Sequence, residues 1–225
     1  MNVLFLAAYP PVLYMHGGGV RMYHNIRLLA RKHSVRVISF YDNDEEMEQL
    51  RMVRSICDSV IAVKRVPDFR PHWLSLTPFM VREFNTPEMY RAVDQAVSAG
   101  DIDVIQYEYL PMAQFRRRGI FSVLTIHETV SANAYASFAA EESPTEKLRL
   151  FYRWMQLLRY EIGQVRKFDR VVTMTEEDAD YLRSYAPEAN IRAIPIGVDL
   201  EEFTPFAPNA HDPLVVLFVG NYRHS

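Results

Sequence analysis

Three consecutive glycines, Gly17, Gly18 and Gly19, stand directly before a segment with helical periodicity. A glycine has no side chain, so a ligand can approach its backbone closely. The free N–H groups at a helix N-terminus also favour a phosphate or another oxyanion. The same glycines could form only a flexible connection, but they follow the first apolar run, where ligands bind in open α/β sheets. That position favours a binding role.

A second candidate is His127, which comes directly after another apolar run. Imidazole titrates near neutral pH, so it can move a proton or donate a hydrogen bond to an anionic oxygen. A single histidine is more often structural, but its position at the carboxyl end of a strand favours function. Glu108 ends the preceding predicted strand. We expect it on the same rim, either as a binding residue or as an acid at the start of a helix.

A parallel sheet would bring these residues together. Short apolar runs alternate with longer segments of helical periodicity, which is typical of repeated βαβ units. Most runs are rich in Val and Ile without strict alternation, as expected where helices cover both faces of the sheet. The sequence predicts an α/β fold with a doubly wound, Rossmann-like parallel sheet. The predicted strands are residues 2–8, 35–41, 59–64, 103–107, 120–125, 170–174 and 191–195.

The predicted helices include residues 20–31, 87–99 and 144–167. Pro87 and Gly100 are the expected start and stop signals of the second, and Thr175 with the acids after it predicts the start of a further helix. The longest helix has one apolar stripe, which we interpret as the core face of a crossover helix, although its basic and aromatic residues would also suit a membrane surface. The stripe consists of Leu148, Phe151, Met155, Leu158, Ile162 and Val165.

Composition excludes several classes of protein. The chain has 225 residues, of which 49% are apolar and 24% charged, so it is long enough for one or two globular domains. A net charge of −3 provides no basic field for nucleic acid. Cys57 is the only cysteine, which excludes an intrachain disulfide and argues against a structural zinc site. A cytoplasmic location follows as the default. No run of about 18 apolar residues predicts a membrane-spanning helix.

A nicotinamide-dependent dehydrogenase is the first rival interpretation. Asp42 and Asp44 follow the second predicted strand, where a ribose-binding acid would belong. However, the spacing G-x-G-x-x-G is absent, and residues 9–16 make the turn too long for that motif. A G-x-S-x-G elbow and a Walker A sequence are also absent, so nothing supports a hydrolase or a kinase.

The chain changes character near its end. Residues 199–213 are acidic and rich in proline, and residues 214–220 are an apolar run of strand length. We therefore predict a Rossmann-like domain over 1–198, an interdomain linker over 199–213, and the first strand of a truncated second domain over 214–225. The chain is then expected to be the first half of a longer two-domain protein.

The order of these motifs resembles the N-terminal half of GT-B glycosyltransferases of the family 4 type, and the resemblance covers nearly the whole chain. Bacterial enzymes that build exopolysaccharide or cell-surface glycans are the most similar. Two departures are Glu128, where Asp or Asn is common, and Ile196, where Asn is common. The motifs are Gly-Gly-Gly-x-Arg at 17–21, Leu-Leu-Ala at 28–30 with His33, Pro-Phe-Met-Val-Arg at 78–82, Thr-Pro-Glu-Met at 86–89, Ile-Gln-Tyr-Glu at 105–108, His127, Arg-Tyr-Glu at 159–161, and the segments 168–178, 194–199 and 217–225.

The resemblance implies a retaining sugar transfer in a cleft between two domains, without a catalytic metal or other cofactor. The N-terminal domain would bind a glycan or lipid-linked acceptor, and the C-terminal domain would bind a nucleotide-diphosphate sugar. His127 would be catalytic, and Gly17, Gly18 and Gly19 would approach the donor diphosphate or its sugar. The residues implied at the acceptor are Arg21, Glu108, Tyr109 and Glu128.

Some alternatives remain open from sequence. A sugar-nucleotide epimerase shares the two-domain architecture, and a non-catalytic carbohydrate- or nucleotide-binding module would need no His127 chemistry. The 225-residue chain alone is expected to be inactive, because most donor contacts would lie beyond Ser225. The run of three arginines from Arg116 to Arg118 would allow peripheral contact with an anionic membrane at its inner face, or could be a solvated turn.

Overall fold

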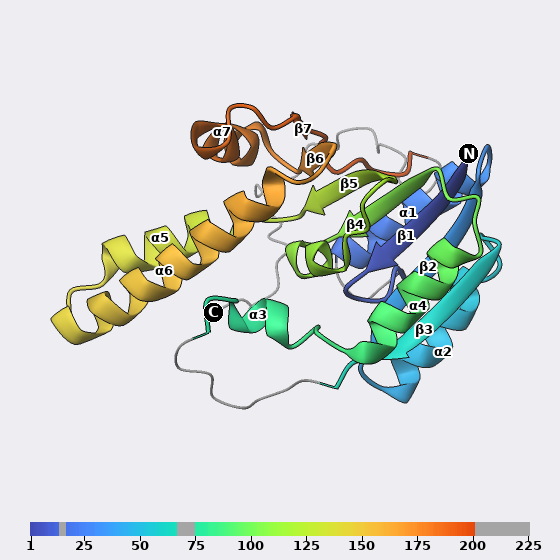
Figure 1. Ribbon diagram of the computed structural model, residues 1–225, viewed down its shortest axis with the longest axis horizontal. Helices are drawn as coiled ribbons and strands as arrows, with labels where there is room; N and C mark the ends of the chain where they lie inside the picture. The colour runs from blue at the N-terminus through green and yellow to red at the C-terminus, as the bar shows by residue number, and fades with distance from the viewer. Residues whose placement is uncertain (14–16, 67–74, 201–225) are drawn as a thin grey trace, which may run out of the picture.

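The computed structural model describes residues 1–13, 17–66 and 75–200. Short runs of branched and aromatic residues form one parallel sheet, so all seven predicted strands are confirmed, with ends shifted by at most two residues (Figure 1). The predicted strand at 214–225 and all but two residues of the predicted linker lie outside the described residues. The strands are β1 (Asn2–Ala7), β2 (Ser34–Tyr41), β3 (Ser59–Lys64), β4 (Val104–Glu108), β5 (Phe121–Ile126), β6 (Arg170–Thr173) and β7 (Ile191–Ala193).

The strand order is β3-β2-β1-β4-β5-β6-β7, with every neighbouring pair parallel. The chain winds outward from β1 to β3 and then crosses back to place β4 on the other side of β1. The connections after β1 and β4 therefore leave the sheet on opposite sides. Such a reversal opens a crevice at the carboxyl ends of the two strands, which is where open α/β sheets bind ligands.

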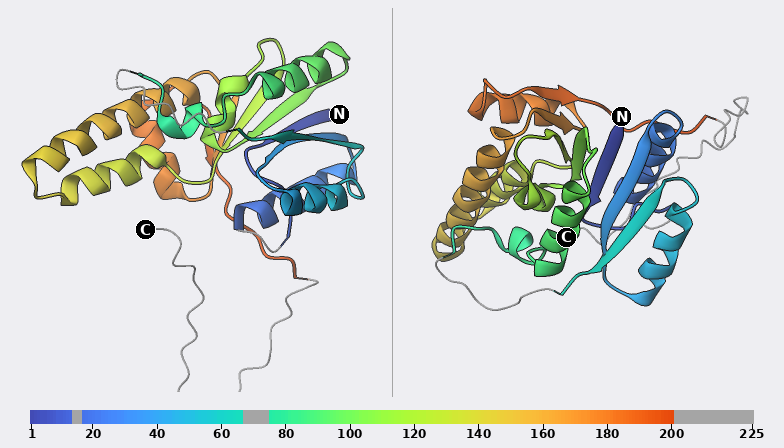
Figure 2. Two further views of the ribbon diagram at one scale, coloured as in Figure 1. Left: turned by 90° about the horizontal axis from the view of Figure 1, so that it is seen from below. Right: turned by 45° about the vertical axis from the view of Figure 1, so that its right-hand side comes forward.

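Helices cover both faces of the sheet (Figure 2). The helices predicted from sequence are confirmed over residues 17–30, 87–98, 144–165 and 176–185. At the start of the last of these, the side chain of Thr175 accepts a hydrogen bond from the Asp178 N–H. The sequence patterns gave no explicit prediction for the remaining helices. The helices are α1 (Gly17–Ala30), α2 (Asp44–Val53), α3 (Phe79–Arg82), α4 (Pro87–Ser98), the 3₁₀ helix η1 (Leu110–Phe115), α5 (Val130–Ala140), α6 (Pro144–Val165) and α7 (Glu176–Tyr185).

The core forms two layers because successive strand residues point to opposite faces. Phe5 of β1 packs with Met22 and Ile26 of α1 on one face. Leu6 of β1 belongs to the larger layer on the other face, which also contains Ile162 of α6. Both faces are thus buried, and the predicted doubly wound architecture is confirmed. In the described part of the chain, no helix has both the length and the apolar character needed to cross a membrane.

The helices α5 and α6 form an antiparallel pair that projects away from the sheet (Figures 1 and 2). We call this pair the arm. The prediction that the whole apolar stripe of α6 faces the core is wrong for its first half: Leu148 is 70% exposed, Phe151 42% and Met155 41%. Ile162 and Val165 are buried as predicted. The first half lies beyond the sheet, so α5 covers only one side of it.

Candidate functional site

The carboxyl ends of β1, β4 and β5 meet at one rim, and α1 begins against it. A β-carbon added at Gly18 would stand 1.8 Å from the Tyr109 hydroxyl oxygen and 3.2 Å from Nδ1 of His127. Only glycine fits at this position without moving the tyrosine. The structure therefore brings together three features predicted from sequence: the glycines in the first turn of α1, Tyr109 after β4, and His127 after β5.

His127 is paired with a buried carboxylate. Its Nε2 lies 2.7 Å from Oε2 of Glu108, whose side chain is fully buried, while the His127 side chain is 9% exposed. The other carboxylate oxygen accepts hydrogen bonds from Thr125 Oγ1, at 3.0 Å, and from Gln106 Nε2. A carboxylate can only accept, so Nε2 of His127 donates to it. In the neutral ring Nδ1 is then the acceptor, and it faces Gly18.

Tyr109 is held in a strained conformation over the histidine. Its φ is +73°, in the left-handed region that non-glycine residues rarely adopt. Its ring stacks on that of His127, with centroids 3.9 Å apart and planes 8° from parallel. The Tyr109 N–H donates to the Thr125 carbonyl oxygen at 3.0 Å. Burial, and secondarily the charge of Glu108, raises the pKa of the Tyr109 hydroxyl, which keeps it a neutral donor. Strain of this kind is typical of functional sites.

A second buried carboxylate fixes the segment that follows His127. The helix α5 has no side-chain cap at its N-cap residue, Thr129. Instead, Glu161 of α6 accepts hydrogen bonds from the N–H groups of Val130 and Ser131, both at 3.1 Å, and from the Ser131 hydroxyl. Burial raises the pKa of Glu161 to about 7, against the opposing effect of the hydrogen bonds. Glu161 thus caps α5 from another helix and ties the His127 segment to α6.

A family model described as Glycosyltransferase Family 4 matches residues 15–202, which is most of the chain. The chain belongs to glycosyltransferase family 4. No curated protein matches this family 4 chain.

Solved structures show the same fold. UGT2 of Phytolacca americana, complexed with UDP-2fluoro-glucose and pterostilbene, has a TM-score of 0.55 and 10% sequence identity over 88% of this chain and 54% of its own. UGT71G1 of Medicago truncatula, complexed with UDP-glucose, has a TM-score of 0.54 and 10% identity over 92% and 53% of the two chains. At these identities the likeness shows the fold alone, and the predicted GT-B fold is confirmed. The family 4 chain spans about half the length of these relatives.

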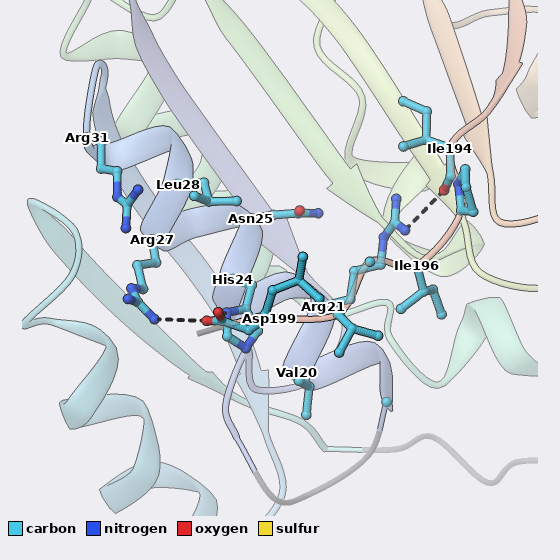
Figure 3. A pocket seen from close by; sticks show the side chains of 15 residues that line it. Val20, Arg21, His24, Asn25, Arg27, Leu28, Arg31, Ile194, Ile196 and Asp199 are labelled. Carbon is cyan, nitrogen blue, oxygen red and sulfur yellow. Dashed lines mark hydrogen bonds and ion pairs between the residues drawn. The ribbon is translucent and has the colours of Figure 1, made fainter. Parts of the chain in front are cut away.

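Two residues expected at the acceptor are bound by protein groups instead. Glu108 is fully buried beneath His127, so we assign it to holding the histidine and not to contacting an acceptor. Arg21 extends from α1 toward β7 and donates from Nη1 to the Ile194 carbonyl oxygen at 3.1 Å (Figure 3). Burial lowers the pKa of Arg21, and the nearby Glu108 charge opposes that effect. In the family 4 chain Arg21 therefore fastens the segment after β7 to α1.

A pocket of about 610 Å³ lies between α1 and residues 194–200, beginning at Gly17 (Figure 3). Its ion pairs are within the chain: Asp199 Oδ2 is 3.6 Å from Arg27 Nη1 and 3.8 Å from His24 Nδ1. Asp199 is one of two residues of the predicted linker that the structure describes. These contacts fasten the start of that segment along α1.

Glu128 is exposed and contacts the arm. Its Oε2 accepts a hydrogen bond from Asn133 Nδ2 at 3.3 Å, and it lines a second hollow that runs outward along the arm. His127 at the rim and Glu128 at this hollow are consecutive residues of the family 4 chain. In the described ranges no three His, Cys, Asp or Glu side chains are grouped as metal ligands.

Sequence reasoning missed the role of Glu161 and the partner of Glu108. Glu161 stands beside Ile162 in a stretch of α6 that is otherwise apolar on its buried side, and a charged residue in such a place is the available signal. Asp42 and Asp44, which a dehydrogenase would need for ribose, have other roles. Asp42 pairs with Arg65, and Asp44 begins α2 after the N-cap residue Asn43.

Proposed function

We propose that this protein transfers a sugar, with retention of anomeric configuration, from a nucleotide-diphosphate sugar to a glycan or lipid-linked acceptor. This chain would be the acceptor-binding half. The observation that carries the proposal is the His127–Glu108 pair facing the glycine-rich start of α1 at the strand-order reversal. Membership of glycosyltransferase family 4 supports the reaction class.

In this proposal the start of α1 binds the donor diphosphate or the sugar attached to it. Gly17 is exposed and has no atoms near the place of a β-carbon, so a phosphoryl oxygen can reach the backbone there. The positive end of the 14-residue helix favours that negative charge. The charge that develops on the departing diphosphate is then stabilised by the helix end and by His127, with no metal ion required.

His127 acts at the reacting sugar. When the ring carries a proton on both nitrogens, Nε2–H donates to Glu108 and Nδ1–H donates toward the glycine side of the rim. A preorganised donor of this kind contributes about 2–4 kcal/mol to transition-state stabilisation. Tyr109 stacks on the ring and prevents it from rotating away. Glu128 and Tyr109 would contact the acceptor.

The proposal also includes contact with an anionic membrane at its inner face. In the run of three arginines, Arg117 pairs with Asp94 and Arg116 lies over the Phe168 ring. Arg118 is exposed. These contacts favour a structural turn over a binding patch. Sedimentation with anionic vesicles at low and physiological salt tests the contact, since binding through arginines must weaken as salt rises.

The proposed reaction is tested with the full-length protein. UDP-, GDP- and ADP-sugars are scanned for release of the nucleoside diphosphate in the presence of a cell-surface glycan or lipid-linked acceptor extract. We expect acceptor-dependent release from one donor, and a fall in kcat of about 10²–10³-fold in the His127→Ala variant. His33→Ala is the matched control, because His33 lies between α1 and β2, at the amino ends of the strands and away from the rim. Equal turnover in folded His127→Ala and wild-type protein would refute the catalytic role.

A further inference from the structure

The hollow along the arm has a volume of about 960 Å³, and its lining includes Glu128, the residue that follows His127 in the chain. Its walls are α3 on one side and the arm on the other. Its lining is mixed. Phe79, Met80, Val130, Ala134, Leu150 and Leu157 supply apolar surface, and polar side chains supply the rest. It therefore offers a ligand both apolar and polar contacts along a path that leads outward from the rim.

Polar groups at the inner end of this hollow already have partners within the chain. Glu128 accepts from Asn133, and Gln156 Nε2 donates to the carbonyl oxygens of Ser75 and Thr77. Gln156 is thus occupied, whereas the exposed Glu128 carboxylate can still accept from an acceptor hydroxyl. Neither group can attract an anion, so recognition of a negative charge must come from the outer end.

The outer end carries two arginines. Arg149 pairs with Glu146, with Nε 2.6 Å from the carboxylate oxygen, and both side chains are exposed. Arg153 is also exposed, and within residues 1–13, 17–66 and 75–200 no hydrogen bond or ion pair involves it. In the same described ranges Arg159 of the same helix is likewise exposed and without such a partner, but it does not line the hollow. What distinguishes Arg153 is that its guanidinium stands beside a partly apolar hollow, which is complementary to an anion attached to an apolar group.

The fold sets the distance between the Arg153 guanidinium and the rim. Trp154, the neighbour of Arg153, stacks on Phe138 of α5, so Arg153 lies level with residues near Ser137. An α-helix rises about 1.5 Å per residue, which places this level about 10 Å along α5 from Val130. A ligand that contacts both ends must hold its anionic group about that far from the group at the rim.

We propose that this hollow is an acceptor subsite for an anionic amphiphile. The acceptor hydroxyl lies at the His127 end, its apolar part lies against Phe79 and Leu150, and a phosphate-type group pairs with Arg153. The inference rests on the proposed function and narrows its acceptor to a lipid-like molecule with a negatively charged head. The occupant is a single acceptor molecule, not a bilayer surface.

The test is calorimetric titration of the full-length protein with octyl phosphate, below its critical micelle concentration, and with octyl glucoside as the neutral counterpart. We expect one-to-one binding of octyl phosphate and weaker binding of octyl glucoside. Arg153→Gln should weaken octyl phosphate binding about ten-fold, because one charge-assisted contact is lost. Arg159→Gln is the matched control, since Arg159 is an exposed arginine of the same helix outside the hollow. Circular dichroism verifies that both variants are folded.

Three outcomes would overturn the subsite: equal affinity for the two octyl compounds, equal effects of Arg153→Gln and Arg159→Gln, or binding only to vesicles of anionic lipid. The last would instead indicate a membrane-surface role for the arm. These results are independent of sugar transfer. If acceptor-dependent turnover is found but octyl phosphate does not bind at Arg153, only the subsite fails. If octyl phosphate binds but no donor is ever turned over, the proposed function fails.

Discussion

The carboxylate of Glu108 lies directly against the His127 ring, 2.7 Å from Nε2, and is itself completely buried. A buried carboxylate is costly unless its oxygens are hydrogen-bonded, and here His127, Thr125 and Gln106 supply the donors. This relationship fixes which nitrogen of His127 faces the rim. It links the core of β4 and β5 to the chemistry at their carboxyl ends.

Glu108→Gln should lower turnover by about ten- to a hundred-fold while the protein stays folded. If the amide oxygen faces His127, the amide N–H groups meet the donors of Thr125 and Gln106. If the amide N–H groups face His127, the ring must carry its proton on Nδ1. Either arrangement disturbs proton placement in the ring. Steady-state kcat with thermal denaturation measures the effect, and Glu88→Gln on the surface of α4 is the control. Unchanged kcat in a folded variant would show that Glu108 does not orient the histidine.

Gly18→Ala should lower the free energy of unfolding by about 1–3 kcal/mol, because the new methyl group would overlap the Tyr109 hydroxyl. Gly17→Ala is the matched control, since no atom lies within 4 Å of a β-carbon at Gly17. The double variant Gly18→Ala/Tyr109→Phe should recover part of the loss, because it removes the atom in conflict. Urea denaturation of wild type, Gly18→Ala, Tyr109→Phe and the double variant measures the coupling, and Gly17→Ala is measured beside them. Equal losses in Gly17→Ala and Gly18→Ala would mean that the close approach to Tyr109 is not the cause.

Glu161 should make stability depend on pH. Burial raises its pKa to about 7, above the 4.5 of a free glutamate, so the folded chain holds a proton that the unfolded chain has released. The contribution to the free energy of unfolding is therefore present below pH 4.5 and decreases as the pH rises to 7, by about 3 kcal/mol in total. The nearby Asp178 acts in the same direction.

Glu161→Gln has no ionisable group at this position and should lack that decrease. Denaturation of wild-type and variant protein is compared at pH 5, 6, 7 and 8, and the difference between the two curves isolates Glu161. Glu88→Gln again serves as the control, because its carboxylate is exposed. Parallel curves for wild type and Glu161→Gln would contradict the raised pKa.

Local patterns explain how much of the fold could be predicted. Each strand is a short apolar run between polar residues, and α4 and α7 begin at threonines whose hydroxyls accept from the backbone three residues later. Such signals lie within one segment. The helix α5 has a weak signal, because it is rich in alanine and its start is capped by Glu161, 30 residues further along the chain. No local pattern shows a cap supplied by another helix.

The candidate site shows the same limit. Strand ends predicted the rim, and the rim does bring Gly18, Tyr109 and His127 together. Which way each side chain points depends on its neighbours in space. Glu108 turns inward because Gln106 and Thr125 offer it donors, and Arg21 turns toward Ile194 because β7 ends beside α1. A sequence predicts that a residue is on the rim more readily than it predicts what the residue touches.

The apolar stripe of α6 provides the last prediction, since its two ends have different environments. Leu148 is 70% exposed on the arm, whereas Ile162 is 6% exposed against the sheet. Leu148→Ala should change the free energy of unfolding by no more than about 0.5 kcal/mol, because its side chain is mostly in water in both states. Ile162→Ala should cost about 2–4 kcal/mol, because it leaves a cavity in the core. Urea denaturation of the two variants distinguishes the environments. A comparable cost at Leu148 would mean that the arm is covered in solution, by a second copy or by another part of the full-length protein.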